Sequence, residues 1–100
     1  MSGTFILTPS AARDLDDILG YVLEHGGATT ALHVYECLHE GVVKVGSEPG
    51  IGHVRDDLVD ESLRVWAVFS YLVIYRPDTK SVQIIRVIHG ARDVPSILDE

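Results

Sequence analysis

Apolar residues recur at helical spacing through the first half of the chain, and this pattern is interrupted once, at Gly26-Gly27. The apolar positions before the glycines are Ala11, Leu15, Ile18, Leu19 and Val22. Those after the glycines are Ala31, Val34, Tyr35, Leu38, Val42 and Val45. Each set lies on one face of a helix, and two helices joined by a short glycine turn form an antiparallel hairpin. We therefore predict one helix from its cap at Thr8 to the glycines, and a second from about Thr30 to Gly46.

The rest of the chain has the alternation and the β-prone composition of strands. We predict strands over residues 4–8, 63–68, 71–75 and 82–89, irregular structure over 50–61, and a short terminal turn near 95–98. The element order is then β-α-α-β-β-β, which places the chain in the α+β class. The expected architecture is a helical hairpin packed on a small, mainly antiparallel sheet.

One face of that sheet is expected to be free for a partner. The helices must cover one face to bury both apolar stripes, and no further element remains for the other face. We expect the free face to carry aromatic and basic residues and to act as a contact surface. Register alone does not decide the face of Trp66, the strongest single anchor candidate. The residues predicted to contact a partner are Trp66, Tyr71, Val73, Tyr75 and Arg76.

Size and charge narrow the class of protein. The 100 residues fit a single domain, 1–100, because domains of about 100–150 residues are common. A net charge of −7 argues against a general nucleic-acid binder, and no sequence-specific DNA binding is expected. The charge is uneven, since residues 1–50 hold two basic and seven acidic groups, whereas residues 62–92 hold five basic groups and one acidic group.

The expected compartment is the cytoplasm. The single cysteine, Cys37, cannot form an internal disulfide, and the N-terminus lacks the zones of a signal peptide. No apolar run approaches the ~20 residues that span a bilayer. No cofactor or metal is expected either, because His33 and Cys37 lie one helical turn apart without a third ligand at suitable spacing.

Two segments near the end of the chain carry a family resemblance. They are Tyr71-Leu72-Val73-Ile74-Tyr75-Arg76 and Ile84-Ile85-Arg86-Val87-Ile88-His89-Gly90-Ala91-Arg92-Asp93. Together with the opening pattern Thr8-Pro9-x-Ala11-x-x-Asp14-Leu15-x-x-Ile18-x-x-Tyr21, they resemble the RelE/ParE toxins of type II toxin–antitoxin systems, most closely the ParE branch. The motif residues of the last third are Tyr71, Tyr75, Arg76, Arg86, His89, Gly90, Arg92 and Asp93.

The resemblance implies a toxin that a cognate ParD-like antitoxin holds inactive in a hetero-oligomeric complex. The ParE branch is associated with poisoning of DNA gyrase. The resemblance therefore implies growth inhibition, and a role in plasmid stabilisation, by a toxin that binds its target rather than by an enzyme. A decayed toxin that keeps only antitoxin binding is a second interpretation.

The RelE branch implies an alternative, a ribosome-dependent mRNA endonuclease. Its candidate catalytic residues here are Arg64, Arg86, His89 and Arg92, because histidine can act as general acid or base and arginines bind phosphates. In a regular strand, however, Arg86 and His89 point to opposite faces. The lysine cluster and near-terminal tyrosine typical of the RelE branch are missing, and the guanidinium of Arg86 could instead pair with Asp14 or Asp93.

Overall fold

The computed structural model describes residues 5–58, 60–77, 80–90 and 94–98. Its elements are β1 (Phe5–Leu7), α1 (Pro9–Ser47), the short 3-10 helix η1 (Pro49–Ile51), β2 (Arg64–Val68), β3 (Tyr71–Arg76), β4 (Val82–His89) and α2 (Val94–Leu98). The sheet has the strand order β1-β4-β3-β2, in which β1 runs parallel to β4 and the other pairs are antiparallel. The α+β class and the helical hairpin on a mainly antiparallel sheet are confirmed.

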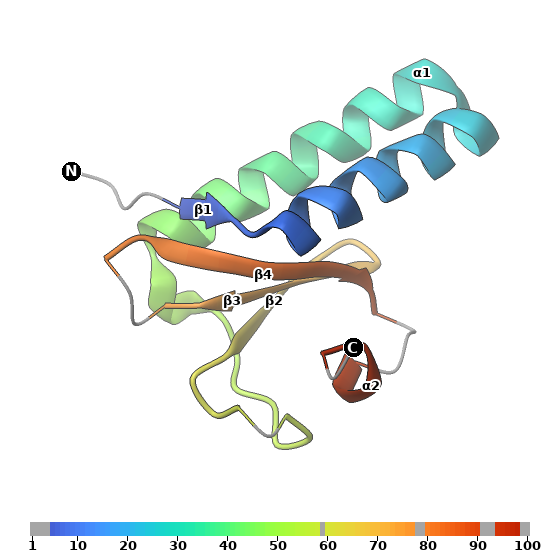
Figure 1. The fold of residues 1–100 in the computed structure, drawn as a ribbon. Coiled ribbons are helices and arrows are strands. Elements are labelled where there is room, and N and C mark those ends of the chain that lie inside the picture. Colours follow the sequence, from blue (N-terminus) through green and yellow to red (C-terminus); the bar gives the residue numbers. More distant parts are fainter. Residues whose placement is uncertain (1–4, 59, 78–79, 91–93, 99–100) are drawn as a thin grey trace.

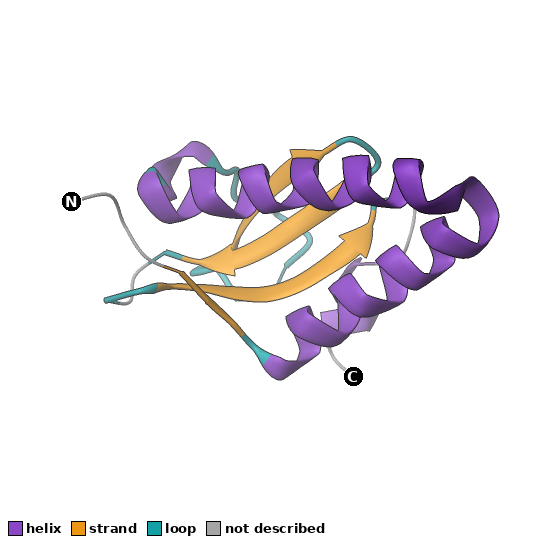
Figure 2. Cartoon of the chain, turned by 90° about the horizontal axis from the view of Figure 1, so that it is seen from above, coloured by secondary structure: helices purple, strands orange, loops and turns teal. Residues whose placement is uncertain are grey.

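The helix α1 is a hairpin of two arms, residues 9–26 and 28–47. Only Gly27 leaves the helical conformation, with φ 83° and ψ 173°. A positive φ suits glycine, which has no Cβ to clash with the backbone. The second helix therefore begins directly after Gly27 rather than near Thr30 as predicted, because one residue suffices to reverse the chain. Figure 2 shows the two arms diverging from this turn, with the sheet visible between them.

Thr8 joins the start of α1 to the sheet. Its hydroxyl accepts a hydrogen bond from the backbone N–H of Ala11 at 3.2 Å, as an N-cap does. The same hydroxyl lies 3.0 Å from the carbonyl oxygen of Ile84 and 2.9 Å from that of Ile85, and can donate its hydrogen to one of them at a time. The first arm consequently begins where β1 ends, against the edge of β4.

The main core lies between α1 and one face of the sheet. Tyr75, which is fully buried there, accepts a hydrogen bond from the N–H of Gly52 at 2.8 Å and donates one to the carbonyl of Pro49 at 2.7 Å. The hydroxyl of Tyr75 therefore ties η1 and the residue after it to the sheet. The buried residues of this core are Ala11, Leu38, Val42, Val45, Val73, Tyr75, Val82, Ile84 and Val87.

The expectation of an uncovered sheet face is wrong. Figure 1 shows α1 on one side of the sheet, and α2 with the segment before β2 on the other. A second core forms there, because the five residues of α2 and the irregular segment supply enough apolar side chains to cover a small sheet. Its buried residues are Leu58, Leu63, Val65, Ile74, Ile88, Val94 and Ile97.

A β-bulge in β4 shifts its register against β3. Ile74 pairs with Arg86, but Tyr75 pairs with Ile84, so Ile85 is the additional residue. Because of this bulge, Ile84 and Val87 both belong to the core under α1 although they are three residues apart.

Candidate functional site

Arg86 in β4 and Asp14 in the first arm of α1 form a two-point ion pair. Nε of Arg86 donates to Oδ2 of Asp14 at 2.7 Å, and Nη2 donates to Oδ1 at 3.0 Å. Oδ2 also accepts from the backbone N–H of Val87 at 3.0 Å, and Nη1 of Arg86 lies 3.4 Å from the carbonyl oxygen of Ile97. The side chains keep only 18% and 13% exposure. A charged pair so far from water needs these extra hydrogen bonds. Asp14, one of the two carboxylates considered from sequence, is thus a partner of Arg86, whereas Asp93 lies outside the described residues.

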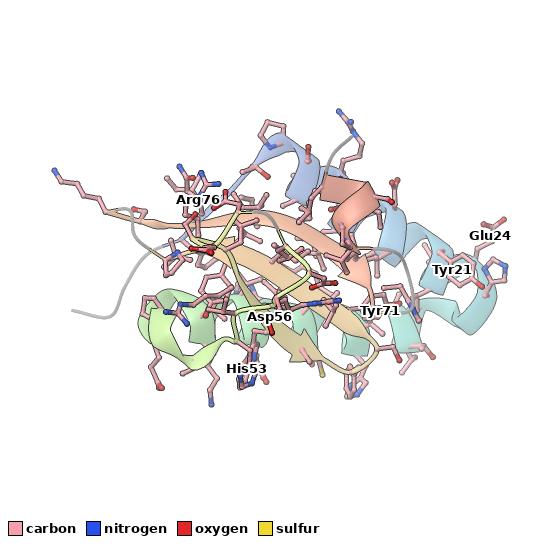
Figure 3. All side chains as sticks on the ribbon, turned by 90° about the horizontal axis from the view of Figure 1, so that it is seen from below. Tyr21, Glu24, His53, Asp56, Tyr71 and Arg76 are labelled. Atoms are coloured by element: carbon pink, nitrogen blue, oxygen red, sulfur yellow. The ribbon has the colours of Figure 1, made fainter. Side chains whose placement is uncertain are left out.

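An open cleft of about 400 Å³ lies beside this pair, between the first arm of α1 and the ends of β3 and β4. We call it the Tyr71 cleft. The rings of Tyr71 and His89 meet edge to face in it, with centroids 5.7 Å apart and planes at 80°. Figure 3 shows Tyr21 and Tyr71 toward the end of the molecule that carries the hairpin turn. The lining residues are Asp14, Asp17, Ile18 and Tyr21 from α1, and Tyr71, Val87, Ile88 and His89 from the sheet.

The Tyr71 cleft brings together residues from two segments of the family resemblance that lie far apart in the sequence. Asp14, Ile18 and Tyr21 belong to the opening helix, whereas Tyr71 and His89 belong to the last third. Sequence reasoning treated the opening pattern as a family marker and did not assign it to a site. The sequence signal that could have placed Asp14, Ile18 and Tyr21 together is their spacing, because residues three, four and seven positions apart share one helical face.

Of the four candidate nuclease residues, the structure describes Arg64, Arg86 and His89, and it does not bring these three together. Arg86 is held by Asp14, and His89 lies in a cleft lined by two carboxylates. Arg64 pairs with Tyr75 and His89 pairs with Tyr71, so they flank β3 at positions roughly 13 Å apart along the strand. Arg92, like Asp93, lies outside the described residues.

The residues predicted to contact a partner are also separated. Val73 and Tyr75 are 0% exposed beneath α1, so in this structure they have no surface to offer a partner. Trp66 faces the same core but is only partly buried, and the ammonium of Lys44 lies 6.0 Å from its ring centroid. Arg76 lies at the other end of β3 from Tyr71, as Figure 3 shows. The expectation that these residues form one surface is therefore not met by the fold.

Arg76 is part of a small polar cluster at the end of β3. Its Nη2 donates to Oδ2 of Asp60 at 2.7 Å. The hydroxyl and the backbone N–H of Ser62 donate to the other carboxylate oxygen, at 2.6 and 3.0 Å. The hydrogen bonds from Ser62, followed by the charge of Arg76, hold the pKa of Asp60 below its usual value. With Arg76 and Arg86 both paired to carboxylates, the sheet does not present the basic face that was expected.

A second surface, which sequence reasoning missed, is an apolar groove between the two arms of α1 beside β1. Leu7 and Tyr35 are 36% and 47% exposed there. We call it the hairpin groove. The helical periodicity predicts Tyr35 in the buried stripe, but it is half exposed at the groove, between two arms that Figure 2 shows diverging. The groove is lined by Phe5, Leu7, Leu15, Tyr35, Leu38, His39 and Val42.

Within the described residues, none of the helices combines the length and the apolar character that a membrane span requires. No three His, Cys, Asp or Glu side chains gather there as metal ligands do; His33 and Cys37 approach to 3.9 Å as an isolated pair.

Comparisons with known proteins point to one family. The sequence profile described as "ParE toxin of type II toxin-antitoxin system, parDE" matches residues 5–94. No protein of curated function matches the chain. Among solved structures, the chain is similar to the chromosomal ParDE system from P. aeruginosa, with 23% identity and a TM-score of 0.75 over 88% of this chain and 96% of that one. It is also similar to the RelBE2 toxin–antitoxin complex from Mycobacterium tuberculosis, with 22% identity and a TM-score of 0.60 over 89% of this chain and 99% of that one.

Proposed function

This chain belongs to the ParE toxin family of type II toxin–antitoxin systems, and we propose that it inhibits growth by binding DNA gyrase until a cognate antitoxin covers it. The observation that carries the proposal is the family match over residues 5–94. The same match supports a role in the maintenance of plasmids and an action inside the cytoplasm, where gyrase is found.

The arrangement of the charged residues supports a binding toxin over a nuclease. A nuclease acting on RNA needs cations around the scissile phosphate and an acid–base pair within reach of it. Around His89 the cleft instead carries Asp14 and Asp17, and the guanidinium of Arg86 is already held by Asp14. A phosphodiester placed at His89 would meet negative charge.

The hairpin groove is the surface that we assign to the antitoxin. Its exposed apolar side chains are Leu7 on β1 and Tyr35 on the second arm of α1, which are 36% and 47% exposed. Such a rim of apolar residues on a small protein marks a surface that a partner covers. An amphipathic segment of the antitoxin fits it, because an antitoxin tail that folds on binding can bury apolar side chains along a groove.

The target is tested by inducing the chain without antitoxin and following plasmid supercoiling, DNA breaks and the 5′ ends of messenger RNA. We expect relaxed plasmid and gyrase-dependent breaks, with translated messages intact. The His89→Ala variant is a matched control, since a binding toxin keeps its toxicity without this imidazole. Site-specific cuts in translated messages, with intact DNA, would instead identify the endonuclease. A folded chain without any effect on growth would identify a decayed toxin.

The antitoxin surface is tested by placing a charge in the hairpin groove. We expect Tyr35→Glu to weaken antitoxin binding by at least about tenfold, because a carboxylate at an apolar contact is costly. Val54→Glu is the control, since Val54 is exposed to a similar degree, 50%, but lies outside the groove. Equal binding by the two variants, measured by calorimetry with the purified antitoxin, would remove the groove from the interface.

A further inference from the structure

Asp17 is the one carboxylate of the Tyr71 cleft that no described cation neutralises. Asp14 is paired with Arg86, whereas none of the ion pairs among the described residues includes Asp17. Asp17 lies one helical turn from Tyr21 on the same face of α1, and both line the cleft. The cleft therefore carries net negative charge beside an aromatic ring.

Each aromatic ring of the cleft contacts a neighbouring side chain. The ring of Tyr21 stacks on that of His25, with centroids 4.0 Å apart, and remains 63% exposed. The ring of Tyr71 packs against the main core and meets His89 edge to face. Val87 and Ile88 belong to the two cores and are 1% and 2% exposed. A ligand in the cleft therefore meets preorganised rings, at a small cost in side-chain entropy.

This combination is complementary to a guanidinium group. A guanidinium stacks on tyrosine rings, has apolar faces, and donates two parallel hydrogen bonds to a carboxylate. An ammonium has no flat face to stack, and an anion would be repelled by Asp17. The charge of −7 on the whole chain favours the approach of a basic segment.

We propose that the Tyr71 cleft binds an arginine side chain of the antitoxin, with Asp17 as its counter-ion and the rings of Tyr21 and Tyr71 as its walls. The proposal rests on the proposed pairing with an antitoxin. The antitoxin is the occupant because the cleft is formed by the same arm of α1 that contributes Leu15 to the hairpin groove, so one wrapped segment reaches both. The solved structures similar to this chain are also toxin–antitoxin systems.

The chemistry of the cleft is tested on the purified chain alone. Isotope-labelled protein is titrated with N-acetylarginine amide at pH 8, where histidines are ordinarily neutral, and backbone NMR signals are followed. We expect saturable shifts at Asp17, Tyr21, Tyr71 and His89. N-acetylcitrulline amide, which has the same shape without the charge, is expected to cause none of them.

Two variants and one control locate the binding. We expect Asp17→Asn and Tyr21→Leu each to weaken the titration by at least about threefold, the effect of losing one exposed ion pair or cation–π contact. Asp16→Asn removes the same charge from the neighbouring exposed position, which does not line the cleft, and is expected to leave the affinity unchanged. Equal weakening by Asp16→Asn and Asp17→Asn would reduce the effect to general electrostatics and overturn the proposal.

The identity of the partner is tested by charge reversal in the complex. We expect Asp17→Arg to raise the dissociation constant for the antitoxin by about tenfold or more. Asp16→Arg should change this constant by less than about twofold. One Arg→Glu substitution in the antitoxin should restore binding to the Asp17→Arg toxin and to no other toxin variant. If Asp17→Arg abolishes toxicity and leaves antitoxin binding intact, the arginine belongs to the target and the proposal is wrong. The arginine titration and the antitoxin dissociation constants are measured without gyrase, so their failure is distinguishable from failure of the proposed target.

Discussion

The hydroxyl of Tyr75 accepts a hydrogen bond from the backbone N–H of Gly52 at 2.8 Å, across 23 residues of sequence. The same hydroxyl donates to the carbonyl of Pro49 at 2.7 Å. Both backbone groups lie between α1 and β2, in a stretch that also forms an isolated β-bridge to the sheet, from His53 to Val65. Tyr75 is thus a main anchor of this connection, and it is buried in the core although it is a residue of the family motif.

Gly52→Ala is expected to destabilise the protein by about 1–3 kcal/mol, because a Cβ on residue 52 would overlap the Tyr75 ring and its hydroxyl. Urea unfolding followed by circular dichroism measures the change. Gly50→Ala is the matched control: a Cβ on residue 50 meets nothing within 4 Å. We expect this control to be neutral or slightly stabilising.

Tyr75→Phe is expected to lower the free energy of unfolding by about 1–3 kcal/mol near neutral pH. The substitution leaves the N–H of Gly52 and the carbonyl of Pro49 without the hydroxyl that they contact. Burial raises the pKa of Tyr75 above its usual value. The stabilisation from a neutral Tyr75 is therefore complete below about pH 10 and is lost as the pH rises through the folded pKa. The stability difference between wild type and Tyr75→Phe should be constant below about pH 10 and should shrink as the pH rises above it. A difference that stays constant above this pH would contradict the assignment.

Asp14→Ala is expected to destabilise the fold by about 3 kcal/mol, since it removes the acceptor of two guanidinium hydrogen bonds from Arg86 and of one from the Val87 N–H. Arg86→Met should cost a similar amount, and the double variant should cost less than the sum of the two. Asp16→Ala, which removes an exposed carboxylate two residues away, should change stability by less than about 0.5 kcal/mol. Additive losses in the double variant would show that the pair is not coupled.

Ser62→Ala is expected to raise the pKa of Asp60 toward its usual value, because the Ser62 hydroxyl is the leading cause that lowers it. Arg76→Gln should raise the pKa less. Carboxyl-carbon NMR titration measures both changes. Since the folded pKa lies below the unfolded one, the stabilisation is present above about pH 4 and is lost on acidification. A larger shift in Arg76→Gln than in Ser62→Ala would reverse the assigned order of causes.

The helical hairpin and the strands could be predicted because they depend on local pattern. The helical stripe broken at Gly26-Gly27 and the alternation in residues 71–75 each fix an element through its own apolar face. The predicted start of the second helix is less accurate, because the boundary depends on the backbone conformation of one residue, Gly27. The pairing of Arg86 with Asp14 was foreseen only as one of two options, since sequence gives the need for a counter-ion and not its position.

The sequence by itself determined the family, the order of the elements and the residues that must be buried, because these follow from motifs and from periodicity along the chain. Only the tertiary structure decided which sheet face is covered and which residues share the Tyr71 cleft. The five residues of α2 and Leu58 close the second face, and the bulge at Ile85 resets which side chains of β4 face α1. Neither feature has a periodic signature, because short helices and bulges are fixed by contacts between segments far apart in sequence. The last third of the chain thus identifies the protein, but its Tyr71 and His89 become a site only when α1 brings Asp17 and Tyr21 beside them.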